Sequence, residues 1–173
     1  LDSNSTDILY HIIFTNRLKL MQTFLPYESF TESAKVLDWR RLGKQRVEGM
    51  QIINAIQNPD AKGWKNHPIT IMWTPYIEIL KDYTNVIIQE WIDRGYNNNM
   101  EFYPKPPVTY HMPYWIGKEE FHSSHRANLL RKDYEYYSKF GWTENPESPY
   151  VWHDKEGLWY EQHVGTGQRN YIG

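Results

Sequence analysis

The sequence predicts a mostly α-helical protein: a compact single domain of three principal helices with long loops, little or no sheet, and an aromatic C-terminal tail. Three observations lead to this fold class. The 173 residues are the length of one ordinary domain. Apolar residues recur at spacings of three and four in separate stretches, as on amphipathic helices. Proline and asparagine clusters separate those stretches.

The first part of the chain contains one extension and two helix signals. Residues 1–20 have no clear period, and we expect an N-terminal extension there, with the domain proper starting at Met21. Ser29 and Glu32 have capping-box spacing, which predicts a short helix to Leu37. Asp38 can cap a second segment over residues 39–57, and Gly49 within its apolar stripe indicates close approach of another backbone.

The second long helix is expected over residues 69–91, where large apolar residues recur at three and four. Pro75 near its start is a possible first turn with Thr74 as cap, and Arg94-Gly95 provides a C-terminal signal. Prolines make residues 97–113 irregular, and a third helix is expected over residues 118–131. The expected domain covers residues 21–142, and residues 143–173 are an irregular tail packed on it.

Composition excludes several classes of protein. No cysteine is present, so disulfide frameworks, zinc-thiolate sites and cysteine nucleophiles are excluded, and the composition fits a reducing cytoplasm. No apolar run reaches the roughly 20 residues of a membrane span. The net charge of −2 means that any nucleic-acid binding depends on a local basic patch.

The first candidate site lies on the helix at residues 39–57. It brings Arg40, Arg41, Lys44 and Arg46 close to one acid, Glu48. At helical spacing Arg41, Lys44, Gln45 and Glu48 share a face beside the apolar stripe, so this face would border a cleft. One interpretation is a solvated face with ion pairs between successive turns. The other is a phosphate-gripping edge, in which Glu48 stays ionised among the cations and stabilises positive charge or moves a proton.

Three further groups of residues are candidates for ligand contact. His122, His125 and Arg126, followed by Arg131 and Lys132, are either packing and surface residues or phosphate contacts. A metal site of His111, His122 and His125 is a third possibility, although the H-E-x-x-H pattern is absent. Aromatic residues between 134 and 142, including Tyr136, Tyr137 and Trp142, form either a packed lid or a base-stacking surface. His67 opens the second helix, as a cap or as a ligand contact.

Three stretches, residues 38–48, 67–97 and 124–142, taken together in this order, resemble the pyrimidine dimer DNA glycosylases of the phage endonuclease V type. Leu42 and Glu48 keep the family's spacing between a leucine and its catalytic glutamate. Residues 67–97 end in Glu90-Trp-Ile-Asp-Arg-Gly-Tyr-Asn97, similar to the end of the family's second long helix. Residues 124–142 contain Arg126 and Tyr136-Tyr137-Ser-Lys-Phe-Gly141, similar to its arginine-bearing helix and aromatic tail.

The resemblance implies a metal-free DNA-repair enzyme without a cofactor, with N-glycosylase and abasic-site lyase activities on pyrimidine dimers in duplex DNA. The family's N-terminal amine attacks C1′ of the damaged nucleotide, an imine forms, and β-elimination cuts the strand. By matching position, Glu48 stabilises the cationic intermediate, and the amine is that of Met21. The residues implied for DNA contact are Arg40, Arg41, Lys44, Arg46, His67, His122, His125, Arg126, Arg131, Lys132, Tyr136, Tyr137 and Trp142.

The start of the domain departs from the family, which exposes a small residue after losing methionine. Here Gln22 follows Met21. If residues 1–20 are retained, residue 21 has no free amine, and another amine such as Lys44 must serve. The alternatives are a non-catalytic DNA-binding module on the same scaffold, a metal-dependent hydrolase, and a protein-interaction domain. We expect a monomer located in the cytoplasm of a bacterial or phage-infected cell, with ultraviolet-damaged duplex DNA as its partner.

Overall fold

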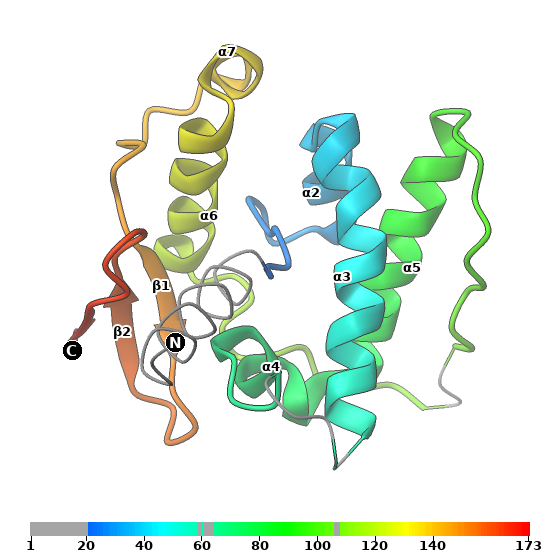
Figure 1. The fold of residues 1–173 in the computed structure, drawn as a ribbon, viewed down its shortest axis with the longest axis horizontal. Coiled ribbons are helices and arrows are strands. Elements are labelled where there is room, and N and C mark those ends of the chain that lie inside the picture. Colours follow the sequence, from blue (N-terminus) through cyan, green and yellow to red (C-terminus); the bar gives the residue numbers. More distant parts are fainter. Residues whose placement is uncertain (1–20, 59, 61–63, 106–107) are drawn as a thin grey trace, which may run out of the picture.

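The structure, a computed structural model, describes residues 21–173 except residues 59, 61–63 and 106–107 (Figure 1). The expected N-terminal extension, residues 1–20, lies outside the described residues. The helices in chain order are α2 (Phe30–Val36), α3 (Trp39–Gln57), α4 (Pro68–Trp73), the 3-10 turn η1 (Thr74–Tyr76), α5 (Ile77–Asp93), α6 (Glu119–Lys132), α7 (Tyr134–Tyr137) and the 3-10 turn η2 (Ser138–Phe140). The strands β1 (Tyr150–His153), β2 (Trp159–Gln162) and β3 (Arg169–Tyr171) follow.

The fold is mostly helical, as predicted, and helix starts follow the capping signals. The Ser29 hydroxyl accepts from the backbone N–H of Glu32, and the Asp38 carboxylate accepts from the N–H groups of Arg40 and Arg41. The helices α3, α5 and α6 are the longest, with 19, 17 and 14 residues. Shorter helices accompany them, so the prediction of three principal helices with long loops describes the fold only in part.

The helix expected over residues 69–91 is divided. It consists of α4, η1 and α5, and the break occurs at Pro75. Proline has no N–H for the helical ladder, and its ring clashes with the preceding turn. The Thr74 hydroxyl donates to the Thr70 carbonyl oxygen, so it does not act as an N-cap. At the far end the prediction holds, because Gly95 ends α5 with a φ of 83°.

The prediction of little or no sheet is wrong for the last part of the chain. Three short antiparallel strands pair in the order β1-β2-β3, with Trp152 opposite Tyr160 and Tyr160 opposite Tyr171. The available signal was two runs rich in aromatic residues on either side of Asp154–Gly157, a turn sequence. Trp152 and Tyr160 are buried in the main core, so this segment is part of the folded unit.

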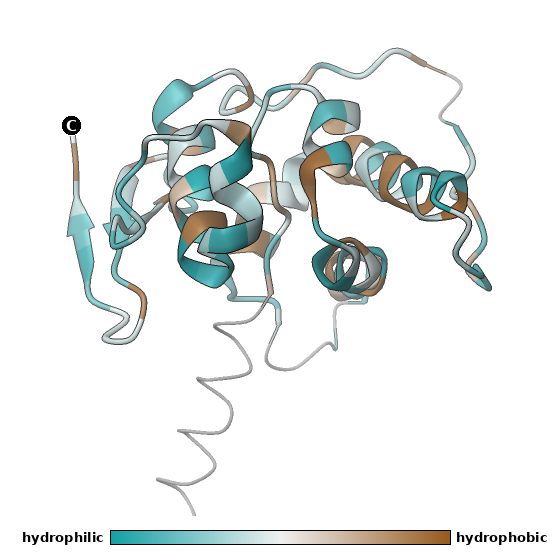
Figure 2. Ribbon diagram, turned by 90° about the horizontal axis from the view of Figure 1, so that it is seen from above, coloured by the Kyte–Doolittle hydropathy of each residue, from teal (hydrophilic) through white to brown (hydrophobic). Residues whose placement is uncertain are grey.

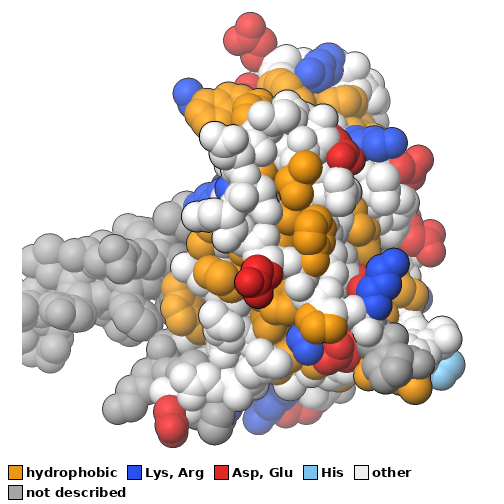
Figure 3. All heavy atoms as spheres, turned by 90° about the vertical axis from the view of Figure 1, so that its right-hand side faces the viewer, with side chains coloured by type: hydrophobic (Ala, Val, Ile, Leu, Met, Phe, Trp, Pro, Cys, Tyr) orange, Lys and Arg blue, Asp and Glu red, His pale blue; other side chains and the backbone are white. Residues whose placement is uncertain are grey.

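The elements form two groups with an extended segment between them (Figure 1). In one group α3 and α2 pack on α5, and in the other β1 packs on α6. Apolar and polar residues alternate along the helices, whereas the strand beside the C-terminus is hydrophilic (Figure 2). The face formed by α5 and the segment after it has scattered charges of both signs (Figure 3).

Candidate active site

Residues 21–25 form an extended segment in the interior, and each of them is buried. Side chains from several elements satisfy the backbone of this segment. Gln45 on α3 accepts from the Phe24 N–H at 2.9 Å, and Tyr83 on α5 contacts the Phe24 carbonyl oxygen at 3.1 Å. A buried segment without helical or sheet hydrogen bonds needs such partners. The backbone of the segment at Phe24 is therefore fixed in place.

The segment brings a backbone nitrogen to Glu48. The Gln22 nitrogen lies 3.4 Å from Oε2 of the Glu48 carboxylate, although the two residues are 26 positions apart. The same oxygen accepts from Gln45 Nε2 at 2.6 Å. The other carboxylate oxygen, Oε1, lies 3.4 Å from the Lys44 ammonium group. Glu48 is thus held between the start of the segment and the cations of α3.

The ionisation of Glu48 differs from the prediction that it stays ionised among cations. Burial raises the pKa of Glu48 to about 7, although Lys44, the Gln22 N–H and Lys132 each act to lower it. Glu48 is only 3% exposed, so the loss of hydration outweighs the attraction of the neighbouring charges. A carboxyl group with this pKa exchanges protons readily near neutral pH, as a general acid or base requires.

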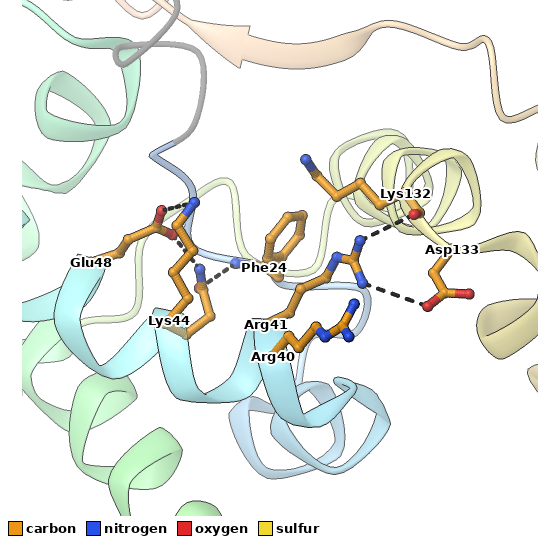
Figure 4. A pocket seen from close by; sticks show the side chains of 8 residues that line it. Phe24, Arg40, Arg41, Lys44, Glu48, Lys132 and Asp133 are labelled. Atoms are coloured by element: carbon orange, nitrogen blue, oxygen red, sulfur yellow. Dashed lines mark hydrogen bonds and ion pairs between the residues drawn. The ribbon is translucent and has the colours of Figure 1, made fainter.

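A pocket of about 260 Å³ opens in front of Glu48 (Figure 4). Side chains from α3, from the buried segment and from the end of α6 point into it. Its lining residues are Phe24, Arg40, Arg41, Lys44, Gln45, Glu48, Lys132 and Asp133. The cations of this set come from α3 and from the end of α6, and they give the pocket the positive charge that binding of an anionic backbone would need.

The basic residues predicted on α3 have different positions. Arg40 and Lys44 are exposed at the pocket. Arg41 also lines it but is bound to Asp38 at 2.6 Å and donates to the Lys132 carbonyl oxygen. Arg46 does not line the pocket, because it donates to the Asn98 side chain and lies over the Trp91 ring.

Lys132 completes the pocket from the opposite side. It is exposed at the end of α6, and its ammonium group points across the pocket (Figure 4). Desolvation lowers the pKa of Lys132, and the charges of Arg41 and Lys44 add to this effect. Lys44 and Lys132 are 88 positions apart in the sequence, and both line the same pocket only because of how α6 packs in the fold.

The two predicted histidines of α6 lie in the interior and hold the buried segment. His125 Nδ1 accepts from the Leu25 N–H at 2.9 Å, so its ring is neutral with the proton on Nε2. His122 Nε2 accepts from the Gly117 N–H, and its Nδ1 contacts the Leu25 carbonyl oxygen at 2.8 Å. Burial lowers the pKa of both rings. Within the described residues, no three His, Asp or Glu side chains gather as a metal site requires.

The arginines of α6 are also engaged within the protein. Arg126 donates to the Pro26 carbonyl oxygen at 2.8 Å and pairs with Glu144 and Glu119. Arg131 donates to the carbonyl oxygens of residues 146 and 148, which hold the segment leading to β1. Both guanidinium groups thus bind other parts of the protein, and neither residue lines the pocket.

The aromatic residues form a packed cluster. The Tyr137 ring is buried and stacks on Trp142 with 5.6 Å between centroids, and its hydroxyl donates to Asp38. Tyr136 packs edge-on against Tyr137 and lies under the Lys139 ammonium group at 3.6 Å. His67 accepts from the Ile69 N–H and caps α4. The structure thus uses these residues as a lid and a helix cap.

Sequence reasoning missed several residues of the site. Phe24, Tyr83 and Asp133 were not selected. Gln45 was placed on the helix face of Glu48 but was given no role, although it contacts both Glu48 and the buried segment. The signal for Gln45 was weak but present, because it lies three residues before Glu48 on one helix face. No signal in the sequence places Phe24 or Tyr83 at the site, since their partners are remote in the chain.

Comparison with known proteins gives one match. The family model for pyrimidine dimer DNA glycosylases matches residues 21–104, a little under half of the chain. The matched part includes the buried segment, α3 and Glu48, whereas α6 with Lys132 lies beyond it. No curated protein and no solved structure matches the chain. No described helix is both long and apolar enough to traverse a lipid bilayer. The family suspected from the sequence is therefore confirmed over residues 21–104: in this segment the chain matches the pyrimidine dimer DNA glycosylases.

Proposed function

We propose that this protein is a DNA-repair N-glycosylase with abasic-site lyase activity on pyrimidine dimers, or a similar lesion, in duplex DNA. The family match supports the glycosylase activity and the DNA substrate. The contact between the Gln22 nitrogen and Glu48, at the edge of a cationic pocket, is the observation on which the mechanism depends. It supports amine catalysis because the backbone one residue after the proposed amine of Met21 lies beside a carboxyl group.

The proposed reaction begins with a free amine at the start of the buried segment. In a protein that begins at Met21, the α-amine is one residue from the Gln22 nitrogen, and its ordinary pKa lies near neutrality. Its lone pair attacks C1′ of the damaged nucleotide, and the bond from C1′ to the base breaks with its electrons leaving on the base, which takes up the proton that the amine nitrogen loses. Glu48 supplies a proton during sugar-ring opening, and the product is a protonated imine.

Strand cleavage follows from the imine. A proton leaves C2′, the electrons move toward the iminium nitrogen, and the 3′ phosphate departs. Ionised Glu48 stabilises the cationic imine, and water then releases the amine. Arg40, Lys44 and Lys132, the exposed cations of the pocket, are the proposed phosphate contacts. A peptide nitrogen cannot attack in this way, because its lone pair is delocalised into the carbonyl group.

Borohydride trapping tests this proposal. A protein that begins at Met21, mixed with dimer-containing duplex, should give a covalent adduct after reduction, and peptide mass analysis should place the adduct on the terminal residue. Glu48→Gln should reduce trapping at least about a hundredfold, as expected for loss of a general acid or base. Glu101→Gln, an exposed acid away from the pocket, should trap like wild type.

The same assay distinguishes the alternatives. An adduct on Lys44, obtained with the full chain, would replace the terminal amine by the side chain that pairs with Glu48. Lesion binding without any adduct, even for the protein that begins at Met21, would overturn the enzyme proposal in favour of a DNA-binding module.

A further inference from the structure

The Gln45 side chain makes contacts that use its entire hydrogen-bonding capacity. Its Nε2 group donates to the Gln22 carbonyl oxygen and to Glu48 Oε2, each at 2.6 Å. Its Oε1 atom accepts from the Phe24 N–H at 2.9 Å and from the Tyr83 hydroxyl at 2.7 Å. An amide has two donors and two acceptor positions, so none is left over. The side chain is 1% exposed and is shielded from water.

The orientation of this amide is determined by its backbone partners. The Phe24 N–H can only donate and the Gln22 carbonyl oxygen can only accept, so exchanging the amide oxygen and nitrogen would oppose like groups at both positions. The donor end of Gln45 therefore faces Glu48. The bond occupies Glu48 Oε2 and leaves Oε1 toward Lys44 and the pocket.

We propose that Gln45 is a positioning residue of the active site, whose amide fixes the backbone of residues 22–24 and the Glu48 carboxylate in one arrangement. This inference rests on the proposed function for its catalytic meaning. Gln45 itself does not reach the reacting atoms; it acts by setting the distance between the amine position and the carboxyl group. Correct placement of two reacting groups accounts for a large part of enzymatic rate acceleration.

An apolar side chain of the same length would preserve the packing but not these contacts. Gln45→Met leaves the Phe24 N–H, the Gln22 carbonyl oxygen and Glu48 Oε2 without this partner. A donor that bonds to a carboxylate favours its ionised form, so its loss makes the proton on Glu48 harder to remove. Loss of these contacts should displace the Glu48 carboxyl group and shift the Glu48 pKa. A role of Gln45 in packing alone would produce neither change.

The test is titration of the Glu48 carboxyl carbon by NMR in the full chain. Gln45→Met should raise the Glu48 pKa by about one unit. In whichever form of the protein traps DNA, Gln45→Met should slow adduct formation at pH 7 about tenfold, with the duplex Kd changed less than twofold. An unchanged Glu48 titration together with an unchanged trapping rate would overturn the proposal.

A second variant covers the case in which Gln45→Met does not fold. Gln45→Glu keeps the shape and the acceptor oxygen but places a second carboxyl group against Glu48 Oε2. Protonated, its single O–H can still donate to Glu48 Oε2, one of the two donor contacts of the amide, so the trapping rate relative to wild type should be highest at acid pH and fall as the pH rises. A profile parallel to that of wild type at every pH would contradict the positioning role.

Gln51 offers the matched control, because it lies on the same helix and is exposed. Gln51→Met and Gln51→Glu should leave the Glu48 titration and the trapping rate unchanged. If wild type forms no adduct at all, the proposed function fails, while the Glu48 titration still decides the structural part of the inference. Failure of one proposal is therefore distinguishable from failure of the other.

Discussion

At the scale of single residues, Glu48 shows how burial competes with nearby charge. Four cations line its pocket, yet the pKa of Glu48 is raised to about 7 from an ordinary value of 4.5 because the carboxyl group is buried. Exposed cations are well screened by water and attract the carboxylate weakly. The molecule thus retains an acid that is destabilising when ionised, as is common at functional sites.

The stability of the Glu48→Gln variant should therefore depend on pH. Glu48 holds its proton more tightly in the folded protein than in the unfolded chain. The wild type therefore loses folding stability as the pH rises from about 4.5 to about 7, and the loss is complete above that range. The full difference is roughly 3 kcal/mol. Measured by urea denaturation, the free energy of unfolding of Glu48→Gln should exceed that of wild type by roughly this amount at pH 8. At pH 4 the two free energies should be equal. An equal gain at both pH values would contradict this explanation.

At the scale of elements, the α3–α5 contact depends on a glycine. The sequence indicated close approach of a backbone at Gly49, but the neighbour is the Thr84 side chain. A Cβ atom on Gly49 would lie 2.4 Å from Thr84 Oγ1, which is fixed by donating to the Leu80 carbonyl oxygen. Thr84 is fully buried and cannot turn toward solvent. The two helices can pack at this distance only because residue 49 has no side chain.

Gly49→Ala should therefore destabilise the fold. Overpacking costs about 1–3 kcal/mol, and the better helix propensity of alanine returns about 1 kcal/mol. We expect a net loss of up to about 2 kcal/mol by chemical denaturation. Adding Thr84→Ala removes the clash, so the double variant should be more stable than Gly49→Ala plus Thr84→Ala would predict by simple addition. A stabilised single variant would show that the helices move apart freely.

At the scale of the whole molecule, the buried segment joins the two groups of elements. On one side Gln45 and Tyr83 hold it to α3 and α5, and on the other His125 and Arg126 hold it to α6. His125 and Arg126, which the sequence predicted as DNA contacts, thus form with Gln45 and Tyr83 an internal clamp, the set of side chains that holds the buried segment from both sides. The position of the amine relative to Glu48 depends on this clamp from both sides.

Arg126→Met should therefore affect mainly stability, and Lys132→Met should affect mainly DNA binding. Arg126→Met leaves Glu144 and the Pro26 carbonyl oxygen without their partner, so it should lower the unfolding free energy by about 3 kcal/mol. Lys132→Met removes an exposed cation of the pocket, so it should weaken duplex binding and reduce its salt dependence at nearly unchanged stability. Denaturation and binding titrations check both; weaker binding by Arg126→Met at full stability would make Arg126 a DNA contact.

Local signals in the sequence determined the helices α2, α3 and α6, the N-caps of α2 and α3, and the glycine that ends α5. They could do so because capping and helical periodicity involve residues only three or four positions apart. The same spacing brought Lys44 and Glu48 together correctly. Proline chemistry also acts locally, yet its effect at Pro75 was underestimated, since the apolar period continues through the break.

Only the tertiary structure decided how the polar residues are used. Gln22 reaches Glu48 across 26 positions, and Leu25 reaches His125 across 100. Burial removed His122, His125 and Tyr137 from the surface and raised the pKa of Glu48, and Arg126 is engaged with the Pro26 carbonyl oxygen. Desolvation and long-range partners depend on which segments pack together, and that information is not contained in the spacing of residues along the chain.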